Sequence, residues 1–470
     1  MIVYVVKVGD TLSNIAYSYQ VTMQAIQQIN QLPNPNKLLV GQAIIIPIPG
    51  TYHTVSSGET LSSIAQTYGI SVDSMIKANR IIDENKLSVG NRLYVPPIVH
   101  VVQAGQTLEQ IAKLYNTTTQ AIIDKNHLTI PNRLYIGASL IIPRPKPEIE
   151  VNGYTYERDK DAAESIAEHG PLLTYLSPFA YKLTENGNLE PFPDKLMLEE
   201  ARNEHITPLL VITNFTSTEK GSNLMHVIFS SKVLQDKILN EAEELMKEKG
   251  YKGLNIDFEN VLPEDREAYN SFLQLAVDRL HPLGYSVSTA LAPKYRSDQP
   301  GLLYEAHDYK THGEIVNFII LMTYEWGWRG APPQAISPIT EMRKVVEYAL
   351  SEVPANKLFL GFQIYARDWK IPFEQGQYAE TFSPQEAIRL ATIYNVAIQY
   401  DTVAEAPYFH YTDESGQQHE VWFEDARSAQ AKFQMVKEYN LRGISYWALG
   451  YPYPQNWALL YDNFTVKKMR

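Results

Sequence analysis

The segment Tyr251-Lys-Gly-Leu-Asn-Ile-Asp-Phe-Glu259 alternates apolar and polar residues along its last six positions. Successive side chains on a β-strand point to opposite faces, so Asn255, Asp257 and Glu259 would share one face and the intervening apolar residues the other. Burial of carboxylates on a strand is unfavourable unless they are hydrogen-bonded or used in chemistry. The segment therefore predicts a strand that carries acidic side chains to a functional edge of a sheet. A satisfied structural network and a surface-facing strand end are the alternatives.

The region around this strand, from residue 148 to residue 470, alternates β-rich apolar segments with helical patterns. Such alternation indicates a parallel sheet with crossover helices. The eight predicted strands are 150–157, 172–179, 207–214, 253–259, 285–293, 316–324, 358–365 and 444–449. Eight such units predict an α/β fold, a (β/α)8 TIM barrel. A doubly wound sheet is the alternative, but it usually has fewer strands, and its glycine fingerprint is missing from this sequence.

The stretch between the last two predicted strands is long and has β-rich runs at 398–401 and 408–423. We expect a hairpin added at the rim of the barrel. Barrel enzymes carry their chemistry at the carboxyl ends of the strands, where Glu259 would lie. Asp257 would lie one pleat deeper, roughly 6–7 Å back along the strand, close enough to modulate Glu259. An acid whose pKa is raised by burial or a neighbouring charge can protonate a leaving glycosidic oxygen.

The region before the barrel contains a threefold repeat. Gly9-Asp-Thr-Leu-Ser-Asn-Ile-Ala16 recurs as Gly58-Glu-Thr-Leu-Ser-Ser-Ile-Ala65 and as Gly105-Gln-Thr-Leu-Glu-Gln-Ile-Ala112, and an asparagine follows each glycine by 21 residues (Asn30, Asn79, Asn126). Each unit predicts a strand, two short helices and a strand, with a threonine capping the first helix (Thr11, Thr60, Thr107). The units span residues 1–48, 51–97 and 98–144, and the proline-containing segment 144–147 is predicted to be a stiff tether. A core of under 50 residues is marginal, and no unit has a catalytic dyad, so we interpret the units as binding modules.

The three units resemble LysM domains, on the Gly-Asp-Thr-Leu start, the mid-unit asparagine and the closing Ile-Pro or Val-Pro. Glu59 and Gln106 replace the aspartate in the later copies. The resemblance implies binding of N-acetylglucosamine glycans, peptidoglycan or chitin, in a shallow groove, formed in the first copy by residues 9–12 and 31–38. Linked weak sites would gain avidity. The alternative for Gly9 and Asn30 is a purely structural role in turn and cap geometry.

Charge and composition exclude several functions. Residues 1–146 have 11 Lys+Arg and 7 Asp+Glu, a balance of +4, so the rest of a chain with net charge −12 carries −16. A domain this acidic is a poor candidate for nucleic-acid binding and suits a neutral or weakly charged partner.

Membrane and cofactor functions also lack support in the sequence. No apolar stretch approaches the roughly 18 residues of a membrane span, and we expect neither membrane association nor a secretory signal peptide. The sequence has 0 cysteines and no phosphate-loop or zinc-protease motif, so we expect no cofactor and no metal.

The fourth predicted strand is similar to the signature of chitinase-type glycoside hydrolases of family 18, Asp-x-x-Asp-x-Asp-x-Glu. Asp257 and Glu259 match its last two acidic positions, whereas Lys252 and Asn255 replace the first two. The resemblance implies that Glu259 is the general acid and then the base. Asp257 would orient the 2-acetamido group of the substrate, whose carbonyl oxygen attacks the anomeric carbon to form an oxazolinium ion. Asn255 removes the proton sharing that paired aspartates allow, so Asp257 should respond mainly to Glu259 and the substrate.

Other predicted strand ends carry further candidates. Met322-Thr-Tyr-Glu-Trp326 is similar to the family's Met-x-Tyr-Asp. This implies that Tyr324 donates a hydrogen bond to the acetamido oxygen and that Glu325 takes the position of the aspartate. Trp447 would form the floor under the reacting sugar, since aromatic faces suit the apolar face of a pyranose, although core packing is the alternative for this residue alone. Tyr365 matches a substrate-binding tyrosine of the family.

Repeats followed by this barrel resemble the cortex-lytic glycosidases of spore-forming bacteria, on stretches such as Glu305-Ala-His-Asp-Tyr309 and Gly443-Ile-Ser-Tyr-Trp447. The resemblance implies a retaining β-N-acetylglucosaminidase that acts on spore cortex peptidoglycan, with chitin oligosaccharides as a further candidate substrate. It also implies synthesis in the mother cell without a signal peptide and a location at the boundary of coat and cortex. The alternatives are a chitinase-like lectin that binds without cutting, a structural spore-coat protein and a true chitinase.

Overall fold

A computed structural model describes residues 1–469 apart from 80, 85, 131–133, 145, 156–158 and 216–221. The chain divides into two compact units. One consists of residues 1–4, 10–32 and 44–147, and the other of residues 5–9, 33–43 and 148–470. Two segments of the first repeat therefore belong to the same unit as the barrel. Residue 145 of the predicted tether and residues 156 and 157 of the first predicted barrel strand lie outside the described residues.

Each repeat folds as a strand, two helices and a strand. The first has β1 (Ile2–Val5), α1 (Leu12–Tyr19), α2 (Met23–Asn30) and β2 (Ala43–Ile46). The second has β3 (Thr51–Thr54), α3 (Leu61–Thr67), α4 (Val72–Asn79) and β4 (Arg92–Val95). The third has β5 (Ile98–Val101), α5 (Leu108–Leu114), α6 (Thr119–Asn126) and β6 (Ser139–Ile142). The predicted threonine caps are confirmed, because the side chains of Thr11, Thr60 and Thr107 each accept a hydrogen bond from a backbone N–H of the first helical turn.

The repeated asparagine joins the second helix of each module to its last strand. The Asn79 side-chain amide donates to the carbonyl oxygens of Met75 (2.9 Å) and Tyr94 (2.7 Å), and its oxygen accepts from the Tyr94 N–H (2.6 Å). Asn30 and Asn126 make the same three hydrogen bonds. In each module the side-chain amide satisfies backbone groups of both elements, so this position has a structural role.

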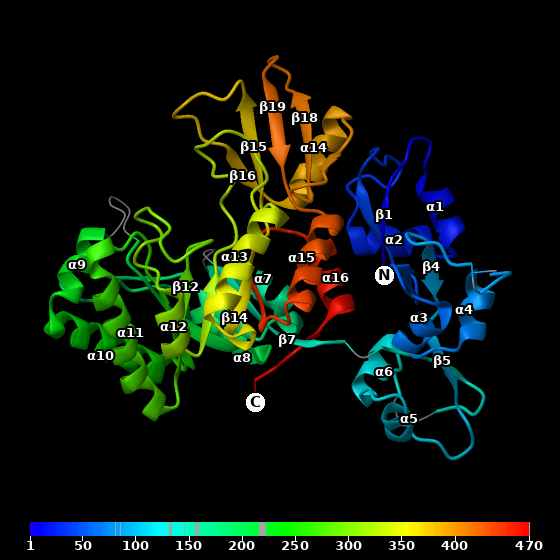
Figure 1. Cartoon of the computed structure of the whole chain (residues 1–470), viewed down its shortest axis with the longest axis horizontal. Coiled ribbons are helices and arrows are strands. Elements are labelled where there is room, and N and C mark those ends of the chain that lie inside the picture. Colours follow the sequence, from blue (N-terminus) through cyan, green and yellow to red (C-terminus); the bar gives the residue numbers. More distant parts are fainter. Residues whose placement is uncertain are drawn as a thin grey trace. The chain divides into compact units, whose positions relative to one another are not determined.

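Eight parallel strands close into a barrel (Figure 1), which confirms the predicted fold class. They are β7 (Glu148–Thr155), β8 (Tyr175–Pro178), β10 (Thr207–Thr213), β11 (Gly253–Asp257), β12 (Ser286–Leu291), β13 (Phe318–Leu321), β14 (Leu358–Gln363) and β20 (Gly443–Trp447). Each pairs with the next in chain order, and β20 pairs with β7. Most strands are shorter than predicted at their carboxyl ends, so Glu259 lies two residues beyond β11.

Helices connect the strands and surround the barrel in Figure 1. They are α7 (Asp159–His169), α8 (Lys195–Asn203), α9 (Ser222–Phe229), α10 (Lys232–Lys249), α11 (Arg266–Leu280), α12 (Tyr309–Ile315), α13 (Ile339–Glu352), α15 (Ala426–Glu438) and α16 (Pro454–Asn463). Two short strands, β9 (Tyr181–Lys182) and β21 (Thr465–Val466), pair with β10 and β7. No helix in the described part of the chain is both long and apolar enough to cross a membrane.

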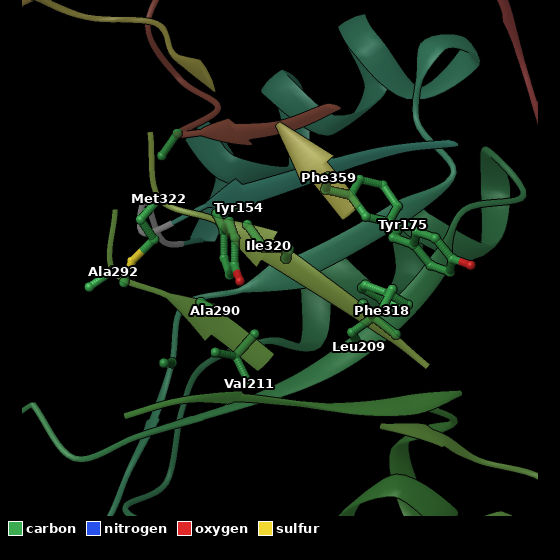
Figure 2. Close-up of a cluster of buried hydrophobic side chains, with 12 residues drawn as sticks. Tyr154, Tyr175, Leu209, Val211, Ala290, Ala292, Phe318, Ile320, Met322 and Phe359 are labelled. Atoms are coloured by element: carbon green, nitrogen blue, oxygen red, sulfur yellow. The ribbon is translucent and has the colours of Figure 1, made fainter. Parts of the chain in front are cut away.

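Side chains fill the inside of the barrel (Figure 2). Leu209 and Val211 of β10 pack there with Phe318 and Ile320 of β13, all at most 1% exposed. Tyr175 stacks on Phe318 with ring centroids 5.4 Å apart. The barrel is thus a packed core and not a pore, and substrate can reach only its ends.

The insertion at the rim is larger than the predicted hairpin. The strands β18 (Ala406–Thr412) and β19 (Gln418–Trp422) do form a hairpin, but it is part of a five-stranded antiparallel sheet. The other elements are β15 (Ala366–Ile371), β16 (Glu380–Phe382), β17 (Gln399–Asp401) and the helix α14 (Pro384–Tyr394). The prediction missed β15 because it directly continues the seventh barrel strand and contains charged residues. Leu39, 4% exposed, belongs to the hydrophobic cluster of this sheet, together with Phe409 and Val421.

Candidate active site

Asn255 lies inside the barrel, fully buried on β11. Its oxygen accepts a hydrogen bond from the Tyr154 hydroxyl (2.7 Å), and its nitrogen donates to Ser288 Oγ (3.0 Å). Both ends of the amide are therefore satisfied by neighbouring strands. A neutral side chain thus occupies the position next to Asp257 on the same face of β11.

Asp257 ends β11 and is 5% exposed. Its Oδ1 is buried and has no hydrogen-bond partner among the described residues. Burial, and then the charge of Glu259, raise the pKa of this carboxyl well above its ordinary value. A buried carboxyl without full hydrogen bonding is destabilising, so its presence indicates chemistry and not packing.

Glu259 lies just outside the strand and remains partly exposed to solvent. Asn214, which directly follows β10 and is 1% exposed, fixes its backbone. The Glu259 N–H donates to Asn214 Oδ1 (2.9 Å), and the Asn214 amide donates to the Glu259 carbonyl oxygen (2.8 Å). Burial, and then the charge of Glu325, raise the pKa of the Glu259 carboxyl, as a proton donor near neutral pH requires.

His307 supports the same loop from the other side. Its Nδ1 accepts from the Ala292 N–H (2.8 Å), so Nε2 carries the proton and donates to the Phe258 carbonyl oxygen (2.9 Å). Burial lowers the pKa of His307 to about 4, which keeps the ring neutral at pH 7. Sequence reasoning assigned no role to His307 or Asn214, although Asn214 ends a predicted strand and a polar residue there was a usable signal.

Tyr324 lies three residues beyond β13, close enough to interact electrostatically with Asp257, Glu259 and Glu325. Burial, and then the charges of Asp257, Glu259 and Glu325, raise the pKa of its hydroxyl well above the ordinary value. The phenol is therefore protonated throughout the physiological range and can donate a hydrogen bond.

Glu325 is held by two further residues of the barrel mouth. The Tyr365 hydroxyl donates to Glu325 Oε1, and Arg367 donates to both carboxylate oxygens, at 2.7 and 2.9 Å. Arg367 is 6% exposed and was not predicted as a site residue. Its bidentate pairing fixes the orientation of the Glu325 carboxylate. Glu325 has φ of 72°, a left-handed conformation that is rare for a residue with a side chain and is typical of constrained functional positions.

Trp447 ends β20 and packs edge-on against Tyr154 and Phe179, with ring centroids 5.5 and 4.8 Å away. Tyr154 in turn contacts Asn255, and its pKa is raised by burial and then by the charge of Asp257. The structure therefore brings together, at the carboxyl end of the barrel, every residue that the sequence proposed: Asn255, Asp257, Glu259, Tyr324, Glu325, Tyr365 and Trp447.

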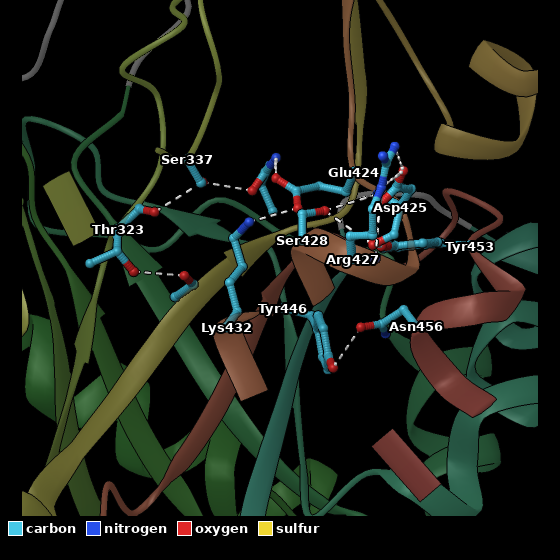
Figure 3. Close-up of polar contacts among 12 residues, drawn as sticks. Thr323, Ser337, Glu424, Asp425, Arg427, Ser428, Lys432, Tyr446, Tyr453 and Asn456 are labelled. Carbon is cyan, nitrogen blue, oxygen red and sulfur yellow. Dashed lines mark hydrogen bonds and ion pairs between the residues drawn. The ribbon is translucent and has the colours of Figure 1, made fainter. Parts of the chain in front are cut away.

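A buried polar network lies behind this site (Figure 3). Lys432 and Glu424 form an ion pair of 2.6 Å with both side chains 1% exposed. Gln363 donates to Glu424 (2.8 Å), and the Ser337 hydroxyl lies within hydrogen-bond distance of both the Gln363 side-chain oxygen (2.7 Å) and the Thr323 carbonyl oxygen (3.0 Å). The network thus connects α15 to the backbone immediately before Tyr324.

These groups suit acid–base chemistry on a neutral substrate. Two carboxyls with raised pKa values lie beside a protonated phenol and an indole at the open end of a barrel. Within the described residues no group of three or more His, Asp or Glu side chains could hold a metal ion. The fold and the site define a glycoside hydrolase of the chitinase type.

The chain belongs to the glycosyl hydrolases family 18, whose model matches residues 172–451. The LysM domain model matches residues 4–47, 53–96 and 100–143. The predictions of a glycoside hydrolase and of LysM repeats before a TIM barrel are confirmed.

Several known proteins are similar to this chain over its full length or nearly so. It is 46% identical to the cortical fragment-lytic enzyme of Bacillus subtilis (strain 168) over 473 aligned residues, which cover 100% of this chain and 99% of that protein. The crystal structure of the spore cortex-lytic enzyme SleL of Bacillus megaterium QM B1551 matches with a TM-score of 0.81 and 37% identity, over 100% of this chain and 99% of that one. SleL of Bacillus cereus gives a TM-score of 0.79 and 37% identity, over 99% and 98% of the two chains.

Proposed function

We propose that this chain is a retaining β-N-acetylglucosaminidase that cleaves spore cortex peptidoglycan, with its LysM modules binding the same glycan. The observation that carries the proposal is the pair of carboxyls of Asp257 and Glu259, whose pKa values are both raised, beside the protonated Tyr324. The cortex substrate is supported by the full-length similarity to the cortical fragment-lytic enzyme of Bacillus subtilis.

In the first step, Glu259 gives its proton to the glycosidic oxygen as the bond to the anomeric carbon breaks. The carbonyl oxygen of the substrate's own 2-acetamido group attacks that carbon and forms an oxazolinium ion. Asp257 accepts a hydrogen bond from the acetamido N–H and stabilises the positive charge that develops there. Tyr324 donates a hydrogen bond to the acetamido oxygen and holds it in line for attack.

In the second step, the Glu259 carboxylate takes a proton from a water molecule, which adds to the anomeric carbon and opens the oxazolinium ring. Two displacements at one carbon return the β configuration, so the reaction retains stereochemistry. Trp447 would support the apolar face of the reacting sugar. Glu325, oriented by Tyr365 and Arg367, raises the pKa of Glu259 and offers oxygens to sugar hydroxyls.

The proposal extends to partners and location. The glycan is peptidoglycan containing N-acetylglucosamine, and chitin oligosaccharides are a secondary candidate substrate. No nucleic acid and no membrane take part. The enzyme would act in the spore, at the boundary of coat and cortex, after synthesis in the mother cell.

The test is a Glu259→Gln variant of the full chain, assayed on cortex fragments by mass spectrometry of the products. We expect a loss of about 10²–10⁴-fold in kcat, because the proton donor is removed, together with unchanged co-sedimentation with peptidoglycan. Glu264→Gln, at an exposed position nearby, is the matched control and should retain activity. Full turnover by Glu259→Gln would refute the proposal.

Two other classes of function make different predictions. A lectin would bind the glycan and release no new reducing ends, even in the wild type. A structural coat protein would keep its role in the spore when Glu259 is replaced. The raised pKa of the Glu259 carboxyl argues against both, because neither needs a proton donor.

A further inference from the structure

The loop that follows β13 carries aromatic side chains that face solvent. Trp328 is 49% exposed, and Tyr378, on the loop between β15 and β16, is 60% exposed. Their rings contact each other edge to face, with centroids 6.1 Å apart. Single exposed aromatics are common, but a contacting pair from two loops forms an apolar surface whose exposure is unfavourable without a ligand.

The backbone holds this pair in place. The Ala379 N–H donates to the Arg329 carbonyl oxygen (2.8 Å), which joins the two loops, and the buried Trp369 indole donates to the Ala331 carbonyl oxygen (2.8 Å). At Gly330 an added Cβ would lie 2.5 Å from the ring of Trp328, so only glycine leaves room for the indole in this position. The aromatic surface is therefore preorganised, which lowers the entropy lost when a ligand binds.

Arg329 adds a positive charge to this surface. Its guanidinium lies 5.2 Å from the centre of the Tyr378 ring. Arg329 is exposed, and it forms no ion pair within the described part of the chain. The cation is therefore available to an anionic ligand.

The surface is directly connected to the candidate active site. Trp328 follows Glu325 by three residues, so their Cα atoms are at most about 11 Å apart. Arg367 Nη1 donates both to Glu325 Oε2 (2.9 Å) and to the Gly327 carbonyl oxygen (2.7 Å), which fixes the start of the loop to the site. A glycan lying across the barrel mouth could reach the aromatic pair within a few sugar units.

We propose that Trp328, Tyr378 and Arg329 form an outer subsite that selects a sugar bearing a carboxylate. The indole would stack on the apolar face of the pyranose, and Arg329 would pair with the carboxylate, such as the free lactyl carboxylate of a muramic acid residue that carries no peptide. The inference rests on the proposed function and deepens it, because it separates glycans with such free carboxylates from neutral chitin-like chains by charge.

Calorimetric binding to the inactive Glu259→Gln chain tests this subsite. The ligands are a muramyl-containing tetrasaccharide with free lactyl carboxylates and chitotetraose, which has none. Adding Arg329→Gln should weaken binding of the muramyl ligand about fivefold and that of chitotetraose by less than about twofold. Adding Trp328→Ala or Gly330→Ala should weaken both ligands, by about tenfold for Trp328→Ala, since stacking is common to both. The LysM modules are unchanged in every variant, so a difference between variants reports on the barrel.

Salt and a matched control complete the experiment. The effect of Arg329→Gln should shrink as ionic strength rises from about 0.05 to 0.5 M, because exposed ion pairs are screened. Arg389→Gln, on the exposed face of α14, removes an equal charge and should change neither affinity. Equal weakening of both ligands by Arg329→Gln, or none, would overturn the subsite. Because binding is measured without turnover, this failure is distinct from persistent hydrolysis by Glu259→Gln, which would refute the proposed function.

Discussion

Asn214 and Glu259 hold each other through two reciprocal hydrogen bonds, N–H to Oδ1 at 2.9 Å and side-chain amide to carbonyl oxygen at 2.8 Å. The pair joins the ends of β10 and β11, so one side chain sets the backbone position of the candidate acid. A loop residue needs such support, because Glu259 lies beyond the last ladder bond of its strand. Contacts of this kind hold catalytic groups at the position and orientation that the reaction requires.

Asn214→Ala should lower kcat by about 10–100-fold and change KM by less than about threefold, because Glu259 loses its position and the sugar sites remain. Steady-state kinetics on cortex fragments measure both values. Asn203→Ala, which removes an exposed amide that bonds Glu200, is the control. Equal losses in kcat for the two variants would show that the effect is not specific to Glu259.

Glu325→Gln should shift the alkaline limb of the kcat/KM profile to lower pH. The negative charge of Glu325 raises the pKa of the Glu259 carboxyl, so a neutral amide lowers that pKa, and the acid loses its proton earlier as pH rises. Measurement of kcat/KM from pH 4 to pH 9 checks the direction of the shift, because this range of about five units covers carboxyl titration in such sites. Glu374→Gln at the exposed rim should leave the profile in place, and a shift of Glu325→Gln to higher pH would contradict the assignment.

Asp257→Asn should stabilise the protein at pH 7 while lowering kcat by about 10²–10³-fold. The folded-state pKa of Asp257 is raised above its unfolded value, so the folded state binds the proton more tightly, and stability falls as pH rises through that interval. The neutral amide side chain of the variant avoids this loss of stability. Thermal unfolding should therefore show a larger gain for the variant at pH 7 than at pH 4, and an equal gain at both would argue against a raised pKa.

Lys432→Met should destabilise the barrel by about 3–5 kcal/mol, because it leaves the buried Glu424 carboxylate without its counter-charge. Adding Glu424→Leu should recover most of the loss, since a buried ion pair can be replaced by apolar side chains. The midpoint of urea unfolding measures both changes. Arg389→Met, which breaks the exposed pair with Glu386 (2.6 Å), should cost less than about 1 kcal/mol.

The sequence alone predicted the barrel, because the alternation of apolar strands with helical patterns is a short-range signal. Alternation along 254–259 assigned Asp257 and Glu259 to one face, whereas Tyr324 and Trp447 were selected by resemblance to family motifs at predicted strand ends. The repeats followed from direct self-similarity. The predictions of the strand ends and of the rim insertion were less accurate, because ladder pairing at an edge depends on neighbouring strands.

Only the tertiary structure decided which residues support the acids. Asn214 is 45 residues from Glu259 in sequence, His307 is 49 from Phe258, and Arg367 is 42 from Glu325. No local pattern marks such partners, because a hydrogen bond depends on the final distance between two strands and not on the period within either one. The sequence therefore determined which side chains could do the chemistry. Closure of the barrel determined their protonation, since burial and neighbouring charges exist only once the strands have met.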